Sequence, residues 1–399
     1  MADADLQTRR QLGRLALALP MAAALAPAAM APAARAQPRA PMPVVPLDIN
    51  ARNALLLDFD TGAVMLDRGA DELMPPASMS KLMTMYVVFD LVEQGRLAMD
   101  QTFLVSAAAR AMGGSRMFLE QGSRVSIEDL ARGVIIQSGN DACVALAEGI
   151  AGSEAAFVDM MNTTARRIGL TASTFRNTTG LPHPEHRMTP RDIATLARRL
   201  ILDFPRHYSL YAEPAFTWNN IRQPNRNPLL GRVEGADGLK TGHTSEAGYC
   251  LVASVQRGRR RLIMVVGGLP TERARAEESE RIISWGFREF VNVVLFNAAD
   301  TIDEVPVYLG ERRTVPLVAG RELVVTVPRD WRDRLEVRAR FTTPVTAPVL
   351  RGQELGRLEV GGPGVAPMSL PLYAGADVDT LNLFARVPAV ARQFLMPGM

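Results

Sequence analysis

Two lysines stand out in a chain that otherwise uses arginine for positive charge. Of the 45 Lys and Arg residues in 399, only Lys81 and Lys240 are lysines. A primary amine can release its proton and act as a base, whereas a guanidinium stays protonated in proteins. The two positions therefore indicate chemistry that requires an amine, and the residues around each lysine indicate which chemistry.

Lys81 follows Ser78 by three residues at the predicted start of a helix. Pro75 and Pro76 precede the serine, and the apolar run Leu82–Phe89 follows the lysine. A proline pair before a helix former predicts that Ser78 lies in the first turn, with Lys81 on the same face. The helix N-terminus favours the anionic serine oxygen, and a neighbouring base activates the hydroxyl. Alone, such a pair is more often an exposed helix face.

A second motif, Ser138-Gly139-Asn140, lies between the apolar run Val134–Ile136 and a helix predicted at Asp141–Gly149. A short polar tripeptide between apolar segments can place a hydroxyl and an amide side chain in a cleft. Taken singly, the tripeptide is better explained as an ordinary helix cap, formed by Ser138 or Asn140.

The second lysine belongs to the segment Asp237–Thr244, which precedes a strand predicted to start at Gly248. Gly242 would leave room for a substrate backbone to approach a strand edge. Lys240 would direct a cation toward a carboxylate or toward Ser138. The alternative is a charged loop beside a hairpin.

Together, the Ser-x-x-Lys, Ser-x-Asn and Lys-Thr-Gly motifs resemble those of the penicillin-recognising serine enzymes. The chain is most similar to the low-molecular-mass D-alanyl-D-alanine carboxypeptidases of the penicillin-binding protein 5 type, over residues 47–296. The resemblance implies an α/β (α+β) fold of the β-lactamase/transpeptidase kind, followed by a β-rich C-terminal domain. It also implies peptidoglycan stem peptides as substrates and β-lactam antibiotics as inhibitors.

The resemblance implies a role for each reacting group. Lys81 takes the proton from Ser78, which attacks the penultimate D-alanine carbonyl and forms an acyl-enzyme. The backbone amides of Ser78 and His243 stabilise the oxyanion. Ser138 and Lys240 relay the proton to the departing D-alanine, and water hydrolyses the acyl-enzyme. No cofactor or metal is required.

Substrate binding is assigned in the same way. Asn140 holds the substrate amide, and Gly242 lies beside the bound peptide. Thr241 and Arg275 bind the terminal carboxylate. Arg275 opens an Arg-x-x-Glu-Ser stretch that precedes Trp285-Gly286-Phe287, as in the family.

Two rival functions remain at this point. A class A β-lactamase uses an additional glutamate in a Glu-x-x-Leu-Asn pattern, which is absent between Ser138 and Lys240. A catalytically feeble protein that only binds the cell wall is disfavoured by the intact motifs. Measuring steady-state turnover of a D-Ala-D-Ala peptide and of a penicillin distinguishes the carboxypeptidase from both rivals.

Other reactive residues are interpreted as structural. His183, Glu185 and His186 lie in a proline-flanked loop without a further ligand nearby, which favours a loop or cap role over a metal site. Cys143 has no adjacent histidine partner and is expected to be a buried thiol. Pairing of Cys143 with Cys250 is the less favoured alternative to two separate buried thiols.

Targeting segments flank the folded part. Residues 1–36 read as a signal peptide, with Arg9 and Arg10 before a short apolar stretch and Ala34-Arg35-Ala36 as the cleavage site. We therefore expect an exported, periplasmic protein on the outer face of the inner membrane. An uncleaved anchor is the less favoured alternative, and the export route, general or twin-arginine, stays open. The net charge of +3 and the absence of a dense basic run disfavour nucleic acid as a partner.

The remaining chain divides into a linker at 37–46, a catalytic domain at 47–296, a β-rich domain at 297–375 and a C-terminal helix at 376–399. That helix, expected from Asp377 to Leu395, is either a peripheral membrane anchor or docked on the β domain. Alternation and helical periodicity predict the elements of the two domains. They are strands at 54–59 and 63–66, helices between 75 and 204, strands at 248–255 and 261–267, a helix at 271–290, and strands at 305–308, 313–317, 323–327 and 335–341.

Overall fold

The computed structural model describes residues 47–298, 300–362 and 365–382. This part of the chain forms two compact units that divide between Val291 and Asn292. The segments interpreted as signal peptide and linker, 1–46, lie outside the described residues, as do 383–399. Within the described residues, no helix is long and apolar enough to cross a membrane.

The first unit is built on a five-stranded antiparallel sheet with the order β2-β1-β9-β8-β7. Strand β7 is therefore one edge of this sheet, a position that matters for the site. The strands are β1 Asn53–Asp58, β2 Val64–Arg68, β7 Ala236–Thr244, β8 Gly248–Arg257 and β9 Arg260–Leu269.

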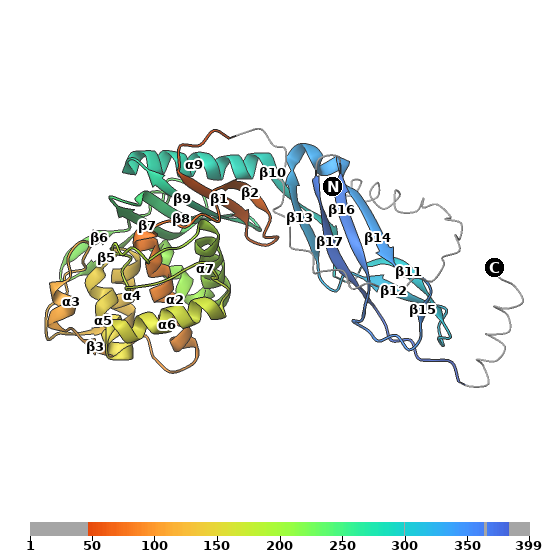
Figure 1. The fold of residues 1–399 in the computed structure, drawn as a ribbon, viewed down its shortest axis with the longest axis horizontal. Coiled ribbons are helices and arrows are strands. Elements are labelled where there is room, and N and C mark those ends of the chain that lie inside the picture. Colours follow the sequence, from red (N-terminus) through yellow and green to blue (C-terminus); the bar gives the residue numbers. More distant parts are fainter. Residues whose placement is uncertain (1–46, 299, 363–364, 383–399) are drawn as a thin grey trace, which may run out of the picture. The chain divides into compact units, whose positions relative to one another are not determined.

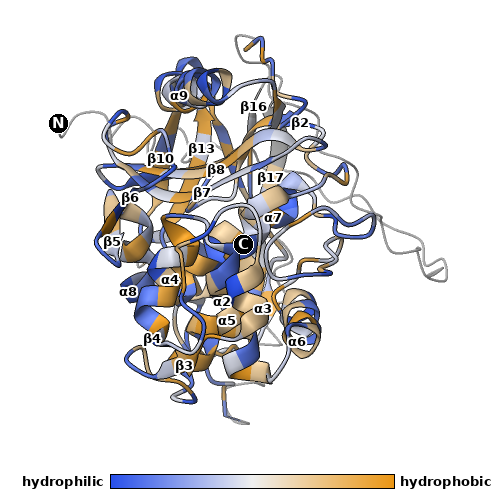
Figure 2. Cartoon of the chain, turned by 90° about the vertical axis from the view of Figure 1, so that its left-hand side faces the viewer, coloured by the Kyte–Doolittle hydropathy of each residue, from blue (hydrophilic) through white to orange (hydrophobic). Residues whose placement is uncertain are grey.

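Helices cover both faces of the sheet (Figure 1). Helix α9 (Glu272–Glu289) packs on β8 and β9, and its hydrophilic residues appear blue in Figure 2. The larger helical cluster lies on the opposite face, with two small hairpins at its border. Its elements are η1 Ala77–Ser80, α2 Lys81–Glu93, β3 Thr102–Leu104, α3 Ala107–Ala111, β4 Arg124–Ser126, α4 Ile127–Ile135, α5 Asn140–Ala151, α6 Glu154–Arg167, α7 Pro190–Asp203, α8 Pro205–Tyr208, η2 Ser209–Ala212, β5 Ala215–Trp218 and β6 Ile221–Pro224.

Local sequence explains how the elements that carry the site begin. Helix α2 is apolar around its circumference and is buried from Lys81 to Phe89, as expected for a helix at the centre of a cluster. Helix α7 has a clear start: Pro190 occupies its first turn, and the Thr189 hydroxyl accepts a hydrogen bond from the Asp192 N–H at 3.1 Å.

The segment around Lys240 is a strand and not a loop. Strand β7 pairs with β8 along its length, with Lys240 opposite Val252 and Thr241 opposite Leu251. A regular strand is recognised in a sequence by alternating apolar and polar residues. This segment lacks that alternation because it contains charged residues and glycines. Here Lys240 and Thr241 are both buried.

The second unit is all-β. A six-stranded sheet has the order β14-β16-β17-β12-β11-β15, and β10 pairs with β13. Strands near the four predicted positions are present, whereas β10, β15, β16 and β17 have no counterpart among the predicted elements. The bounds are β10 Phe290–Phe296, β11 Thr301–Tyr308, β12 Thr314–Val318, β13 Leu323–Pro328, η3 Arg329–Arg334, β14 Glu336–Phe341, β15 Val345–Thr346, β16 Glu354–Gly362 and β17 Val365–Ala374.

The first residues of the predicted C-terminal helix are not helical. Val378 forms a β-bridge with Val349, and Thr380 forms one with Gly310. Residues 377–382 are thus attached to the β-rich unit in extended form, because backbone pairing with that unit replaces the helical hydrogen bonds. The rest of the predicted helix lies outside the described residues.

Candidate active site

Ser78 and Lys81 meet where a short 3₁₀ turn passes into α2. Ser78 lies in η1, just before the α-helix proper, and Lys81 is the first residue of α2. The Lys81 Nζ donates to the Ser78 Oγ at 2.8 Å and to the Thr179 carbonyl oxygen at 2.6 Å. The predicted proximity of serine and lysine is therefore observed, and the carbonyl of Thr179 holds the amine in place.

The environment of Lys81 makes its amine a stronger candidate base than a solvated lysine. The side chain is 1% exposed. Burial, reinforced by the positive charge of Arg226, lowers the pKa of Lys81 from 10.5 to about 8, although Cys143 and Asp141 oppose the shift. Burial acts in this direction because it disfavours the charged form. A neutral amine is thus accessible near physiological pH.

Lys240 approaches the same site from the edge strand β7. It is 2% exposed, and its Nζ donates to the Thr241 carbonyl at 3.2 Å. Burial holds the pKa of Lys240 well below its usual range, and the positive charges of Lys81 and Arg226 add to the effect. The two lysines, one on α2 and the other on β7, are therefore electrostatically coupled in one buried site.

The Ser138-Gly139-Asn140 segment connects α4 to α5, and the charge of Asp141, the next residue, acts on Lys81. Ser138 has a φ of 64°, and it is 2% exposed. Asn140 directs its side-chain Nδ2 to the Gly113 carbonyl at 2.8 Å. The segment is not a simple side-chain cap, because neither residue caps α5 through a hydrogen bond. Among the described residues, no hydrogen bond joins the Ser138 hydroxyl to either lysine.

Gly242 allows β7 to pack directly against the turn that carries the serine. A Cβ at this position would lie 3.0 Å from the Pro76 carbonyl oxygen and 3.3 Å from the Ser78 backbone N. Such contacts are tighter than most real Cβ contacts, so a side chain at this position would push on the turn that carries Ser78. The glycine therefore suits the packing of the protein itself, in addition to the room for substrate inferred from the sequence.

His243 and Arg275 are linked through Tyr249. The His243 ring stacks on Tyr249 with centroids 4.0 Å apart, and the Arg275 guanidinium lies 5.8 Å from the same ring. Arg275 is 5% exposed, its Nε has no hydrogen-bond partner within the described structure, and Glu272 is 3.9 Å away. Burial lowers the pKa of Arg275. A buried guanidinium with an unused donor is suited to receive an anion.

Sequence reasoning missed several residues that the structure brings to this site. Arg226 donates to the Ser115 hydroxyl at 2.6 Å, and its charge acts on both lysines. Thr179 supplies the carbonyl that binds Lys81. Asn225-Arg226-Asn227 also resembles the family, so a signal for Arg226 is present in the sequence. No local pattern points to the carbonyl of Thr179.

The loop histidine is a structural residue. His186 is 2% exposed, and its Nδ1 accepts the Arg176 N–H at 3.4 Å. A neutral ring with that acceptor carries its proton on Nε2, which donates to the Ser80 hydroxyl at 2.8 Å. Within the residues that the structure describes, no cluster of His, Cys, Asp and Glu could hold a metal ion.

The two cysteines are separate buried thiols, as favoured from the sequence. Burial raises the pKa of Cys143 to about 12 and that of Cys250 to about 11, against the lowering effect of nearby positive charges. A protonated thiol is a poor nucleophile. Cys143 is thus unsuited to replace Ser78 as the attacking group.

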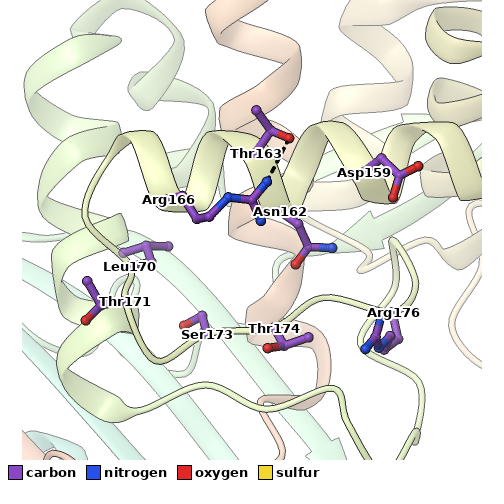
Figure 3. Close-up of a pocket in the computed structure, with 9 residues that line it drawn as sticks. All are labelled: Asp159, Asn162, Thr163, Arg166, Leu170, Thr171, Ser173, Thr174 and Arg176. Carbon is purple, nitrogen blue, oxygen red and sulfur yellow. Dashed lines mark hydrogen bonds between the residues drawn. The ribbon is translucent and has the colours of Figure 1, made fainter.

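A hollow of about 610 Å³ lies elsewhere, between α6 and the loop that follows it (Figure 3). Its lining is polar and includes Arg166, which donates to the Thr163 hydroxyl. None of the candidate catalytic residues lines it. Asn162, also in the lining, already uses both amide atoms within the protein. We therefore place the site at the two lysines and not at this hollow.

A serine beside a buried lysine, a second lysine on an edge strand and helices on both faces of the sheet define a penicillin-recognising serine enzyme. Residues 37–271 match the family described as D-alanyl-D-alanine carboxypeptidase, peptidase S11. Residues 290–380 match the penicillin-binding protein 5 C-terminal domain. The chain belongs to the D-alanyl-D-alanine carboxypeptidase family and is a hydrolase of the serine peptidase type.

Individual relatives support this assignment. The chain is 41% identical to the D-alanyl-D-alanine carboxypeptidase DacC of Escherichia coli, covering 85% of this chain and 87% of that protein. Penicillin-binding protein 5 from Haemophilus influenzae has a similar structure, with a TM-score of 0.80, 37% identity and coverage of 84% and 100%. Penicillin-binding protein D2 from Listeria monocytogenes, in an ampicillin-bound form, gives a TM-score of 0.56, 30% identity and coverage of 61% and 99%. The resemblance, fold class and enzyme class predicted from the sequence are confirmed.

Proposed function

We propose that Ser78 is the acylated nucleophile of a D-alanyl-D-alanine carboxypeptidase and that Lys81 is its base. The observation that carries this proposal is the 2.8 Å hydrogen bond from Lys81 Nζ to Ser78 Oγ, made by an amine whose pKa burial lowers to about 8. A positioned base with a pKa near the working pH is what general base catalysis requires.

The reaction then runs in two steps. Neutral Lys81 takes the hydroxyl proton while the Ser78 oxygen attacks the penultimate D-alanine carbonyl carbon. The oxyanion accepts hydrogen bonds from the backbone N–H groups of Ser78 and His243, each worth about 3 kcal/mol in the transition state. The proton passes through Ser138 and Lys240 to the leaving amine as the peptide bond breaks. Water then attacks the ester and releases the shortened peptide.

Substrate orientation rests on three groups. The Asn140 amide faces the acyl part of the substrate, and the Thr241 hydroxyl and Arg275 bind the terminal carboxylate. The unused Nε of the buried Arg275 supports this assignment. The hydrogen bonds of the relay through Ser138 would form in the substrate complex, since catalytic hydrogen bonds often tighten only there.

Intact mass before and after exposure to benzylpenicillin tests the central claim. We expect one penicilloyl adduct, mapped to the peptide that contains Ser78, and none in the Ser78→Ala variant. An adduct on another residue, or no adduct at all, would refute the assignment. Steady-state turnover distinguishes the rivals. A carboxypeptidase releases D-alanine from a D-Ala-D-Ala peptide and stays acylated by penicillin, whereas a β-lactamase hydrolyses the penicillin rapidly.

We further propose that the enzyme is exported to the periplasm and associates with the outer face of the inner membrane. The basic and apolar pattern of residues 1–36 and the apolar residues of the C-terminal tail support this. Truncation after Asn382 is the appropriate test, because it preserves the β-bridges of Val378 and Thr380. Membrane fractionation that is the same for the truncated and the mature enzyme would contradict tail anchoring.

A further inference from the structure

A loop between α3 and β4, residues 113–119, is attached to the Ser-x-Asn motif by its backbone. The Asn140 N–H donates to the Ser115 carbonyl at 2.7 Å, and the Asn140 side chain binds the Gly113 carbonyl at 2.8 Å. A Cβ on Gly114 would lie 3.0 Å from the same side-chain nitrogen. The loop therefore forms the border of the site on the side of Asn140.

Asp141 fixes the second half of this loop. Its buried carboxylate accepts three successive backbone N–H groups, those of Met117 at 3.0 Å, Phe118 at 3.0 Å and Leu119 at 3.1 Å. Phe118 has a φ of 69°, which a bulky aromatic residue rarely adopts. The side chains of Met117 and Leu119 are buried, whereas that of Phe118 is 43% exposed. The protein thus holds an aromatic ring outward in an unfavourable backbone conformation, as functional sites often do.

Arg116 lies over this ring. Its guanidinium carbon is 5.5 Å from the Phe118 centroid, within the range of a cation–π contact. Arg116 has no ion-pair partner within the residues that the structure describes. Arg226 donates to the hydroxyl of Ser115 in the same loop. The loop therefore presents a positioned and unpaired cation at the rim of a site that is already positively charged.

We propose that Arg116 and Phe118 form a subsite for a carboxylate on the residue that precedes the two D-alanines of the substrate. This inference rests on the proposed function, because Asn140 holds the amide of the acyl part there and the preceding residue then passes along the loop. The guanidinium binds a carboxylate in a bidentate manner, and the Phe118 ring covers the apolar stem of that side chain. The preferred substrates are peptides whose third residue carries a free acid.

Two peptides that differ in one carboxylate test the subsite. Both end in D-Ala-D-Ala, and the residue before is meso-diaminopimelate in one and L-lysine in the other. We expect Arg116→Gln to lower kcat/KM for the diaminopimelate peptide about fivefold, in line with one partly exposed ion pair, and to leave the lysine peptide unchanged. Arg166→Gln, on α6 at the separate hollow, is the matched control and should change neither value.

Binding measurements keep this test independent of catalysis. Calorimetry on the Ser78→Ala protein, with and without Arg116→Gln, should show that Arg116→Gln lowers the affinity for the diaminopimelate peptide by the same factor of about five. The difference in affinity between the two proteins should shrink in high salt. Equal losses for both peptides, or no loss for either, would overturn the subsite. If the parent enzyme hydrolyses neither peptide, the proposed function fails, while the affinities still decide whether the subsite exists.

Discussion

Gly180 packs against the carbonyl group of Ala77, the residue that precedes Ser78. A Cβ at Gly180 would overlap the Ala77 carbonyl oxygen and lie 3.2 Å from the Ser78 backbone N. Gly180 has a φ of 78° and Ala77 a φ of 47°, so both are in the left-handed region. Because the residue before Gly180, Thr179, binds Lys81, one short loop contacts both the proposed nucleophile and its proposed base.

We predict that Gly180→Ala slows acylation by penicillin by about a hundredfold, since displacement of a reacting group by about 1 Å has effects of this size. The added methyl must push the Ala77–Ser78 backbone away from its present position. Stopped-flow measurement of the acylation rate constant tests this prediction.

The control for that variant is Gly152→Ala. Gly152 has a φ of 77°, similar to that of Gly180, but a Cβ there would meet no atom within 4 Å. This substitution should cost about 1 kcal/mol in stability from backbone strain alone and leave the acylation rate intact. Equal acylation rates in the Gly180 and Gly152 variants would show that the contact with Ala77 does not position Ser78.

The pKa of Lys81 predicts the pH dependence of acylation. Because burial lowers this pKa to about 8, the neutral amine that accepts the Ser78 proton accumulates as pH rises toward 8. The second-order acylation constant should rise about tenfold per unit below pH 8 and level off above it. A profile that continued to rise until about pH 10 would indicate a base with an ordinary lysine pKa.

The predictable part of the site is the part that is local in sequence. The three-residue spacing of Ser78 and Lys81 predicts their contact, because a single helical turn brings such residues together. The contact of Thr179 with Lys81 joins positions 98 residues apart, and no periodicity in either segment encodes it. Such a contact depends on how the helices pack.

Strand β7 shows a second limit. Its sequence reads as a loop because buried Lys240 and Thr241 occupy adjacent positions of a strand that carries two glycines. Residues of the candidate site here break the alternation from which strands are recognised, as expected at functional sites. The family resemblance singled out this motif, although no strand was predicted for its residues.

His186 is predicted to make stability depend on pH. Burial lowers its pKa to about 4, helped by the charges of His183 and Lys81, whereas an unfolded histidine titrates near 6.5. Between these values the unfolded chain binds a proton that the folded protein does not. The stabilisation is therefore present above pH 6.5 and is lost as pH falls toward 4, by up to about 3 kcal/mol.

We expect His186→Gln to reduce this acid sensitivity, because glutamine can still donate to the Ser80 hydroxyl but does not titrate. Urea unfolding at pH 7 and at pH 4.5 measures the difference. His183→Gln, in the same loop but exposed, is the control and should retain most of the parent dependence, because burial is the main cause of the lowered His186 pKa. The same acid sensitivity in the His186 variant as in the parent would assign the effect to other groups.

Arg275 is predicted to act on the substrate carboxylate. Arg275→Gln should raise KM for a D-Ala-D-Ala peptide about tenfold or more, because a charge-assisted hydrogen bond to a buried group is worth about 1.5–3 kcal/mol. The peptide amide, which lacks the carboxylate, should be a poor substrate for the parent and be little affected by the substitution. A comparable rise in KM for the peptide acid and the peptide amide would favour a purely structural role for Arg275 on α9.

The two lysines are predicted to respond differently to arginine. Lys81→Arg should abolish acylation although it keeps the charge, because a guanidinium with a pKa above about 12 cannot serve as a base. Arginine is also bulkier and planar at a position that is 1% exposed, where the compact ammonium of Lys81 fits between Ser78 and the Thr179 carbonyl.

Lys240→Arg should be milder than Lys81→Arg, because it interrupts the proposed proton relay through Lys240 but keeps a cation near the substrate carboxylate. We expect slower acylation and weaker substrate binding with residual activity, measured as the acylation constant for penicillin and as kcat/KM for the peptide. The chain contains 43 arginines, given 45 basic residues of which two are lysines, yet it places lysine at these two positions alone. Acylation of the Lys81→Arg enzyme at close to the parent rate would refute the assignment of Lys81 as the base. Complete loss in both variants would instead indicate that Lys240, like Lys81, must transfer a proton and cannot act by its charge alone.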